Sequence, residues 1–188
     1  MNKKLFFLVI SIFSTIILAF YFLFNSTIFD NTNYNYVNVN GVNIKGDKTK
    51  YKVNFVEKID GDTIVVNFNG RNMKVRYLLI DTPETVKPNT KVEPYGPEAS
   101  NFNGNILKNA KTVEIEFDIY AKEDKYHRAL CYVYADGKSV QEQLLEQGLA
   151  EIKYVHEPDT RYLKKFAKAQ NKAKSNKRNI WSNSDCEC

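Results

Sequence analysis

IDGDTIVVNFNGRNMKVRYLLIDTPE, residues 59–84, is the stretch that decides the fold. Apolar side chains alternate over residues 64–68, as in a strand with one buried face. Asn69-Gly70 follows, and such a pair is the strongest short-range hairpin signal, because a type I′ turn needs positive φ at both central residues. Residues 74–80 are the predicted return strand. The stretch therefore predicts a β-hairpin.

Acidic residues flank the predicted hairpin in the sequence, one before its first strand and one after its second. Asp62 precedes the first strand and Asp81 follows the second, so strand pairing brings the two carboxylates to one end. Thr82 can add its backbone carbonyl, because a residue before proline is held extended. Oxygen ligands favour Ca²⁺ or Mg²⁺ over Zn²⁺. Each acidic turn taken alone has another explanation, an Asp side chain that bonds its own backbone, but two at one hairpin end predict a divalent-cation site.

Two arginines and a glutamate complete the candidate chemistry. Arg76 interrupts an apolar strand and Arg128 begins another. Phosphoryl transfer gives a reason for both, because charge builds up on the equatorial oxygens and guanidinium groups stabilise it bidentately. The alternative for Arg76 is a surface residue or an ion-pair partner. Glu84 lies just beyond the proposed metal ligands, where it can act as a base toward water.

The remaining patterns complete a small α+β domain. Five strands and about three helices in this order fit an OB-type β-barrel with packed helices, and barrel closure removes the exposed strand edges. The predicted strands are residues 51–57, 64–68, 74–80, 112–118 and 128–135. The predicted helices begin at Pro97, at Ser139 and after a capping Asp159, and Gly148 ends the second. Their expected inward faces are Ala99, Phe102, Ile106 and Ala110 in the first and Tyr162, Phe166, Ala169 and Ala173 in the third.

Composition and charge restrict the class of protein. With 188 residues and 43% hydrophobic content, the chain can form one domain plus an extension. The formal charge of +5 is unevenly spread, because residues 161–178 hold eight Lys or Arg and no acid. Such a helix suits a polyanion, and a solvated basic face is the alternative.

Cysteine usage excludes a disulfide framework and a zinc cluster, because the chain holds three Cys and two His. Cys131, within an apolar strand, is predicted to be a small buried side chain. Cys186 and Cys188 end the chain and are interpreted as part of a frayed tail, with a redox pair, a metal-sensitive tag or an intermolecular crosslink as the alternatives.

The N-terminal residues 5–24 contain no charge and match the thickness of a bilayer core. They predict a membrane-directed segment. The length and the lack of an A-x-A-like site favour an uncleaved anchor over a cleaved signal peptide. Lys3 and Lys4 would stay inside, so the rest of the chain is expected to be exported, anchored or secreted after cleavage.

The Asn-rich residues 25–48 are interpreted as a linker, with a short hairpin at Asn40-Gly41 as an addition. The predicted domain then covers residues 49–182 and leaves residues 183–188 as a tail.

Six segments resemble the staphylococcal nuclease (thermonuclease) family, in order and with matching spacing over some 130 residues. They are IDGDT (59–63), RYLLIDTPET (76–85), VEPYGPEAS (92–100), DKYHRALCYVYADGK (124–138), QGLAEIKYVHEP (147–158) and NIWS (179–182).

This resemblance implies an OB-fold, calcium-dependent nuclease that acts on DNA and RNA and leaves 3′-phosphate ends. A monomer is expected. The positions that match the family's calcium ligands are Asp62, Asp81 and the carbonyl of Thr82. Those that match its catalytic residues are Arg76, Glu84 and Arg128. Those that match its phosphate- and base-binding positions are Lys125, Tyr126, Tyr154 and His156.

Three positions depart from the family pattern. His127 stands where the family has glycine, so a positive φ there would carry a penalty and could displace Arg128. His156 replaces a tyrosine, which predicts weaker substrate binding. Thr90 lies in a loop that tends to be basic in the family. The His127→Gly and His156→Tyr variants are expected to change the kinetics.

Two other classes compete with the enzyme. A nucleic-acid-binding OB-fold module tethered at the cell surface would have lost acidic or arginine positions, and none is lost here. An anchored scaffold explains the apolar N-terminus but not the complete set of candidate site residues.

Overall fold

The computed structural model describes only part of the chain, namely residues 37–39, 42–44, 46–85, 91–120 and 123–182. The predicted N-terminal segment, Thr90, Cys186 and Cys188 lie outside these ranges. Within them, no helix has both the length and the apolar character needed to cross a membrane.

Five strands form a closed barrel, as predicted. They are β3 (Lys50–Lys58), β4 (Thr63–Phe68), β5 (Arg71–Tyr77), β7 (Val113–Phe117) and β8 (Ala129–Ala135). Neighbours in the order β5-β4-β3-β7-β8 are antiparallel. Parallel pairing of Val75 with Ala129 and of Tyr77 with Cys131 then joins β5 to β8 and closes the barrel. The chain therefore has the α+β, OB-type architecture that its alternation predicts.

The predicted hairpin turn is confirmed. Asn69 has φ 49° and Gly70 has φ 81°, the positive pair that a type I′ turn requires. Gly70 has open space around it, so backbone conformation rather than packing explains the glycine. The register pairs Phe68 with Arg71. The return strand thus begins at Arg71, three residues before the predicted start.

The prediction of one unbroken return strand over residues 74–80 is wrong. β5 ends at Tyr77, and Leu79 adopts a positive φ of 66° that breaks the strand. The chain then forms β6 (Ile80–Asp81), which pairs with β10 (Glu151–Ile152) instead of with β4. Leu79 is buried, and its side-chain packing holds the strained backbone in place. This break turns Asp81 toward β10.

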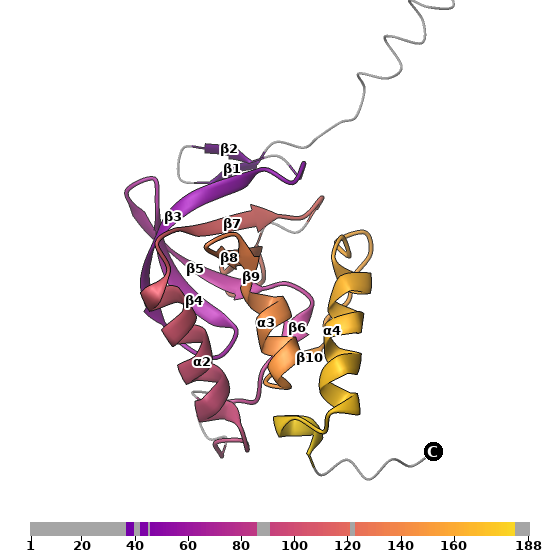
Figure 1. Cartoon of the computed structure of the whole chain (residues 1–188). Coiled ribbons are helices and arrows are strands. Elements are labelled where there is room, and N and C mark those ends of the chain that lie inside the picture. The colour runs from indigo at the N-terminus through magenta and orange to yellow at the C-terminus, as the bar shows by residue number, and fades with distance from the viewer. Residues whose placement is uncertain (1–36, 40–41, 45, 86–90, 121–122, 183–188) are drawn as a thin grey trace, which may run out of the picture. The chain divides into compact units, whose positions relative to one another are not determined.

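Three helices pack against the barrel. They are α2 (Gly96–Asn109), α3 (Val140–Gln147) and α4 (Leu163–Ser175), followed by the 3₁₀ turn η1 (Asn179–Trp181). The short strand β9 (Lys138–Ser139) leads into α3, which lies between α2 and α4 (Figure 1). The predicted bounds of α3 are confirmed, because the Ser139 hydroxyl accepts from Glu142 N and Gly148 ends the helix with φ 66°.

Two predictions about helices need correction. Asp159 does not cap α4, because the helix begins later and its N-cap is Tyr162. The Asp159 carboxylate instead accepts a hydrogen bond from Tyr120 N at 2.7 Å. On α2 the buried side chains include Leu107, which the predicted face omits, whereas Phe102 is only half-buried. The inward face of α4 agrees with the prediction at Phe166, Ala169 and Ala173.

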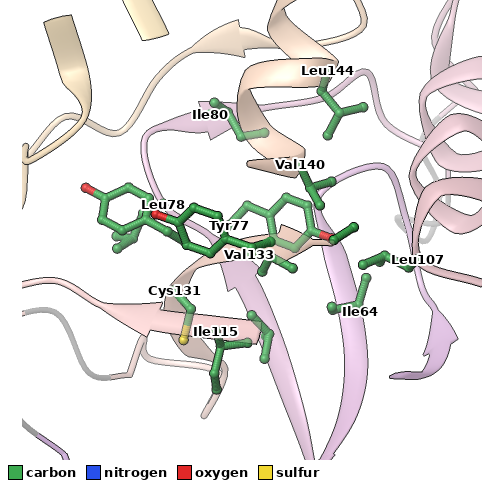
Figure 2. Close-up of a cluster of buried hydrophobic side chains, with 14 of the residues drawn as sticks. Ile64, Tyr77, Leu78, Ile80, Leu107, Ile115, Cys131, Val133, Val140 and Leu144 are labelled. Atoms are coloured by element: carbon green, nitrogen blue, oxygen red, sulfur yellow. The ribbon is translucent and has the colours of Figure 1, made fainter. Parts of the chain in front are cut away.

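The core lies where α2 and α3 meet the barrel wall. Figure 2 shows Leu107 from α2 and Val140 and Leu144 from α3 together with the strand residue Ile64. Cys131 on β8 is fully buried, as predicted for a small apolar side chain.

The Asn-rich segment contributes to the folded unit. β1 (Val37–Val39) and β2 (Val42–Ile44) form the short hairpin that the sequence suggested. Ile44 has no exposed surface and belongs to the core cluster. Packing therefore begins upstream of residue 49.

A buried group of charges, here called the Arg161 cluster, joins the start of α4 to β7 and β8. Arg161 pairs with Glu116 at 2.5 Å and with Asp118 at 3.2 Å, and neither carboxylate has exposed surface. The hydroxyls of Tyr134 and Tyr132 donate to Glu116 and Asp118 respectively. Arg161 also donates to the carbonyl of Gly46 at 2.7 Å, so the cluster fixes the N-terminal entry to the barrel.

Candidate functional site

One open cleft of about 1070 Å³ lies beside the hairpin end. Its volume is at the upper end of the range for small-molecule sites, which suits a segment of an extended ligand. The structure brings all ten candidate site residues to this cleft. They are Asp62, Arg76, Asp81, Thr82, Glu84, Lys125, Tyr126, Arg128, Tyr154 and His156.

Arg76 joins the two carboxylates of the hairpin. Its Nη2 donates to Asp81 Oδ1 at 2.6 Å, while its Nη1 forms an ion pair with Asp62 Oδ2 that lacks hydrogen-bond geometry. The Arg76 side chain is about nine-tenths buried. Arg76 is therefore an ion-pair partner, which was the alternative to a catalytic role. It also lines the cleft.

Asp62 is held from several directions at the start of β4. Its Oδ2 accepts from Thr82 N at 3.0 Å and from the Thr82 hydroxyl at 3.2 Å. Burial raises the pKa of Asp62, and the nearby Arg76 guanidinium acts in the opposite direction. A Cβ on Gly61 would lie 2.5 Å from the Thr82 hydroxyl, so only glycine permits this approach of the two turns.

The donor set fits a hard divalent cation. Asp62 and Asp81 converge on one positive group, the Arg76 guanidinium, and they carry only oxygen donors. In the described ranges, no three His, Cys, Asp or Glu side chains gather into a metal cluster. A cation here would thus take two carboxylates and the Thr82 carbonyl, and water or phosphate oxygens would complete its shell.

Glu84 is positioned by a loop that is tied to the turn before β4. Thr85 N donates to Glu84 Oε1 at 3.0 Å, and the Thr85 hydroxyl donates to Asp60 Oδ1 at 2.6 Å. Asn103 of α2 donates to the backbone carbonyl of Asp60 at 3.1 Å. Burial raises the pKa of Asp60. Sequence reasoning gave Asp60 no role, although its place in the same acidic turn as Asp62 was a usable signal.

Arg128 is held by an acidic residue that sequence reasoning missed. Asp124 Oδ2 accepts from Arg128 Nε at 2.7 Å, and Asp124 Oδ1 accepts from the Arg128 backbone N at 3.0 Å. Burial would raise the pKa of Asp124, but the hydrogen bonds from Arg128 outweigh it and lower that pKa. The turn from Asp124 to Arg128 thus fixes the guanidinium in the cleft.

His127 has the positive φ that its place in the family pattern suggested, 58°. Arg128, the next residue, lines the cleft. The His127 ring contacts Glu123 at 2.6 Å on an exposed surface.

The His127→Gly variant should be more stable than the wild type by about 0.5–1 kcal/mol. Glycine adopts a left-handed conformation without a Cβ penalty, and the exposed contact with Glu123 contributes little. Urea unfolding measures the difference, with His127→Ala as the control that keeps the penalty. A glycine variant no more stable than the alanine variant would contradict the account.

Aromatic side chains form part of the cleft wall. Tyr126 is 65% exposed and Tyr154 is 57% exposed. The Arg128 guanidinium lies 5.4 Å from the Tyr126 ring, and that of Arg76 lies 5.7 Å from the Tyr154 ring. Tyr120, 60% exposed, lines the same cleft. Tyr120 lies between two predicted strands, and the sequence alone gave it no role.

The basic helix lies apart from the cleft wall. Lys165 and Lys172 pair with the α3 acids Glu142 and Glu146, and Arg161 is in its buried cluster. None of the residues 161–178 lines the cleft, whose cations are Lys74, Arg76, Lys125 and Arg128. The α4 charge therefore does not by itself identify the site.

Comparisons with known proteins found a matching family and several relatives. The family described as Staphylococcal nuclease homologue matches residues 74–183. The SPbeta prophage-derived endonuclease YokF of Bacillus subtilis (strain 168) is 55% identical over 124 residues, 66% of this chain and 42% of that protein. Endonuclease YncB of the same strain is 51% identical over 137 residues, 73% of this chain and 64% of that protein. A thermonuclease of Staphylococcus hyicus is 45% identical over 133 residues, 71% of this chain and 76% of that protein.

The match thus spans about half the length of the two Bacillus relatives.

Proposed function

The chain belongs to the staphylococcal nuclease family, and from this premise we propose that it is a calcium-dependent nuclease that hydrolyses phosphodiester bonds of DNA and RNA. The observation that carries the proposal is the convergence of two carboxylates, two arginines and a glutamate in one cleft. Relatives named endonuclease and thermonuclease support a nucleic-acid substrate.

The three candidate catalytic residues have separate roles in the proposed reaction. Glu84 orients the attacking water and accepts its proton. The water oxygen bonds to phosphorus while the bond from phosphorus to the 5′ oxygen breaks. That oxygen takes up a proton from solvent, which leaves a 5′-hydroxyl and a 3′-phosphate. Arg76 and Arg128 donate to the phosphoryl oxygens as charge builds up on them.

Asp62, Asp81 and the Thr82 carbonyl would hold Ca²⁺. The ion supplies Lewis-acid polarisation of a phosphoryl oxygen when it is bound. Calcium suits a site of this kind because it accepts flexible oxygen coordination with waters in the shell.

The exposed aromatics give the cleft a means of binding the nucleotide beside the scissile bond. Tyr126 and Tyr154 offer flat faces on which a base can stack, which contributes about 1–3 kcal/mol per base. Lys125 supplies a phosphate contact. His156 also lines the cleft and offers a smaller ring, so we expect His156→Tyr to tighten substrate binding.

The location of the protein is also proposed from its N-terminal residues 5–24. Export would place the domain where calcium is abundant and cytosolic nucleic acid is spared. We propose a monomer at the outer face, anchored or released after cleavage. Protease treatment of intact cells, followed by fractionation, tests this.

The product ends distinguish this reaction from other phosphodiester cleavage. Cleavage of a labelled single-stranded oligonucleotide in Ca²⁺ should leave 3′-phosphate and 5′-hydroxyl ends. Mass spectrometry of the fragments measures both ends. Fragments with 5′-phosphate ends would contradict the assigned direction of attack.

A further inference from the structure

Lys153 is a cation that lies against a predicted metal ligand. β10 pairs with β6, and Lys153 N continues this pairing by donating to Leu79 O at 3.0 Å. The Lys153 ammonium lies 2.9 Å from Asp81 Oδ2 and 3.2 Å from Glu151 Oε1. The backbone contact therefore fixes Lys153 beside Asp81 in the folded chain.

Both carboxylate oxygens of Asp81 consequently accept from cations. Arg76 Nη2 contacts Oδ1 at 2.6 Å, and Lys153 Nζ contacts Oδ2 at 2.9 Å. A divalent ion that takes Asp81 as a ligand has to share or displace one of these contacts. Arg76 is buried and belongs to the proposed catalytic set, whereas the Lys153 side chain is 46% exposed and can move into solvent. Lys153 is thus the cation that yields.

We propose that Lys153 is a built-in counter-ion of Asp81, which lowers the affinity of the cleft for a divalent cation and neutralises Asp81 when none is bound. The inference rests on the proposed metal site. Its physical basis is repulsion between an ammonium and a divalent ion a few ångströms apart, together with the cost of breaking the existing ion pair. Because the ammonium is half exposed, solvent weakens both the repulsion from the divalent ion and the ion pair with Asp81. The expected effect is about five- to tenfold in affinity rather than many orders of magnitude.

Calorimetric titration of the full chain with Ca²⁺, without nucleic acid, tests the proposal. Lys153→Met keeps most of the aliphatic stem and removes the charge, so it should bind Ca²⁺ about five- to tenfold more tightly than the wild type. Lys153→Arg keeps a charge and should stay close to the wild type. Lys138→Met, an exposed lysine on β9, is the matched control because it changes the net charge equally. The gain should shrink as ionic strength rises.

Thermal unfolding measures the effect of Lys153 on Ca²⁺ binding in a second way. Added Ca²⁺ should raise the Tm of Lys153→Met more than it raises the Tm of the wild type. If Lys153→Met and the wild type bind Ca²⁺ equally, the counter-ion role is wrong and the proposed nuclease stands. If neither binds Ca²⁺, both this role and the calcium requirement are wrong.

Discussion

Replacing Glu84 by glutamine should lower kcat by about three orders of magnitude while the protein stays folded. The substitution keeps the size of the side chain and the oxygen that accepts from Thr85 N, but it removes the ability to take a proton from water. The loop also keeps the backbone contact of Glu84 N with Glu93 at 2.9 Å. The loss should therefore fall on the chemical step.

Single-turnover cleavage of single-stranded DNA in saturating Ca²⁺ measures this loss. The matched control is Glu98→Gln, an exposed glutamate in the first turn of α2, which should keep wild-type kcat. Binding of DNA by Glu84→Gln should stay within a few-fold of the wild type. A kcat lowered less than tenfold would remove Glu84 from the role of base.

The Arg161→Met variant should lose about 3–5 kcal/mol of unfolding free energy. Arg161 is the cation that pairs with both Glu116 and Asp118, which have no exposed surface. Methionine fills much of the volume but leaves two buried negative charges near each other. The carbonyl of Gly46 also loses its donor, so the entry to the barrel should loosen.

Urea unfolding of matched variants separates the destabilisation by Arg161→Met from the effect of losing one positive charge. Lys165→Met removes the ion pair between exposed Lys165 of α4 and Glu142 of α3, and it should cost less than about 1 kcal/mol. Adding Glu116→Gln and Asp118→Asn to Arg161→Met should recover part of the loss, because the uncompensated charges are gone. An Arg161→Met variant as stable as Lys165→Met would show that the Arg161 cluster contributes no net stability.

Local chemistry made much of the fold predictable. The Asn69-Gly70 turn and the Gly148 cap depend on the preferences of a few adjacent residues, and both are confirmed. Alternation of apolar residues identified the five barrel strands, although β4 and β8 are buried at nearly every position in the structure.

The errors in the fold arise where distant contacts override local preference. Leu79 breaks a strand because Asp81 continues into pairing with β10, some 70 residues away. Asp159 resembles a helix cap, but it bonds Tyr120 instead. Arg161 belongs to a basic run in the sequence, yet its side chain is only 11% exposed, because it pairs with Glu116 of β7 and with Asp118, which directly follows β7.

The same limit applies to the site. Asp62, Arg76 and Asp81 are predictable as a group, because they lie in or directly beside one hairpin in the sequence. The residues that position or oppose them are less visible: Asp124 holds Arg128 through a turn, and Lys153 reaches Asp81 across β6 and β10. The Asp124 contact depends on the conformation of one turn, and the Lys153 contact joins residues that are far apart in the sequence.

Hydrolysis of DNA by the purified full chain in Ca²⁺, in Mg²⁺ and in EGTA tests the central claim most directly. We expect cleavage of single-stranded and duplex DNA in Ca²⁺, no cleavage in EGTA, and recovery when Ca²⁺ is restored. Folded protein that binds DNA in Ca²⁺ but does not cleave it would contradict the account and indicate a nucleic-acid-binding module.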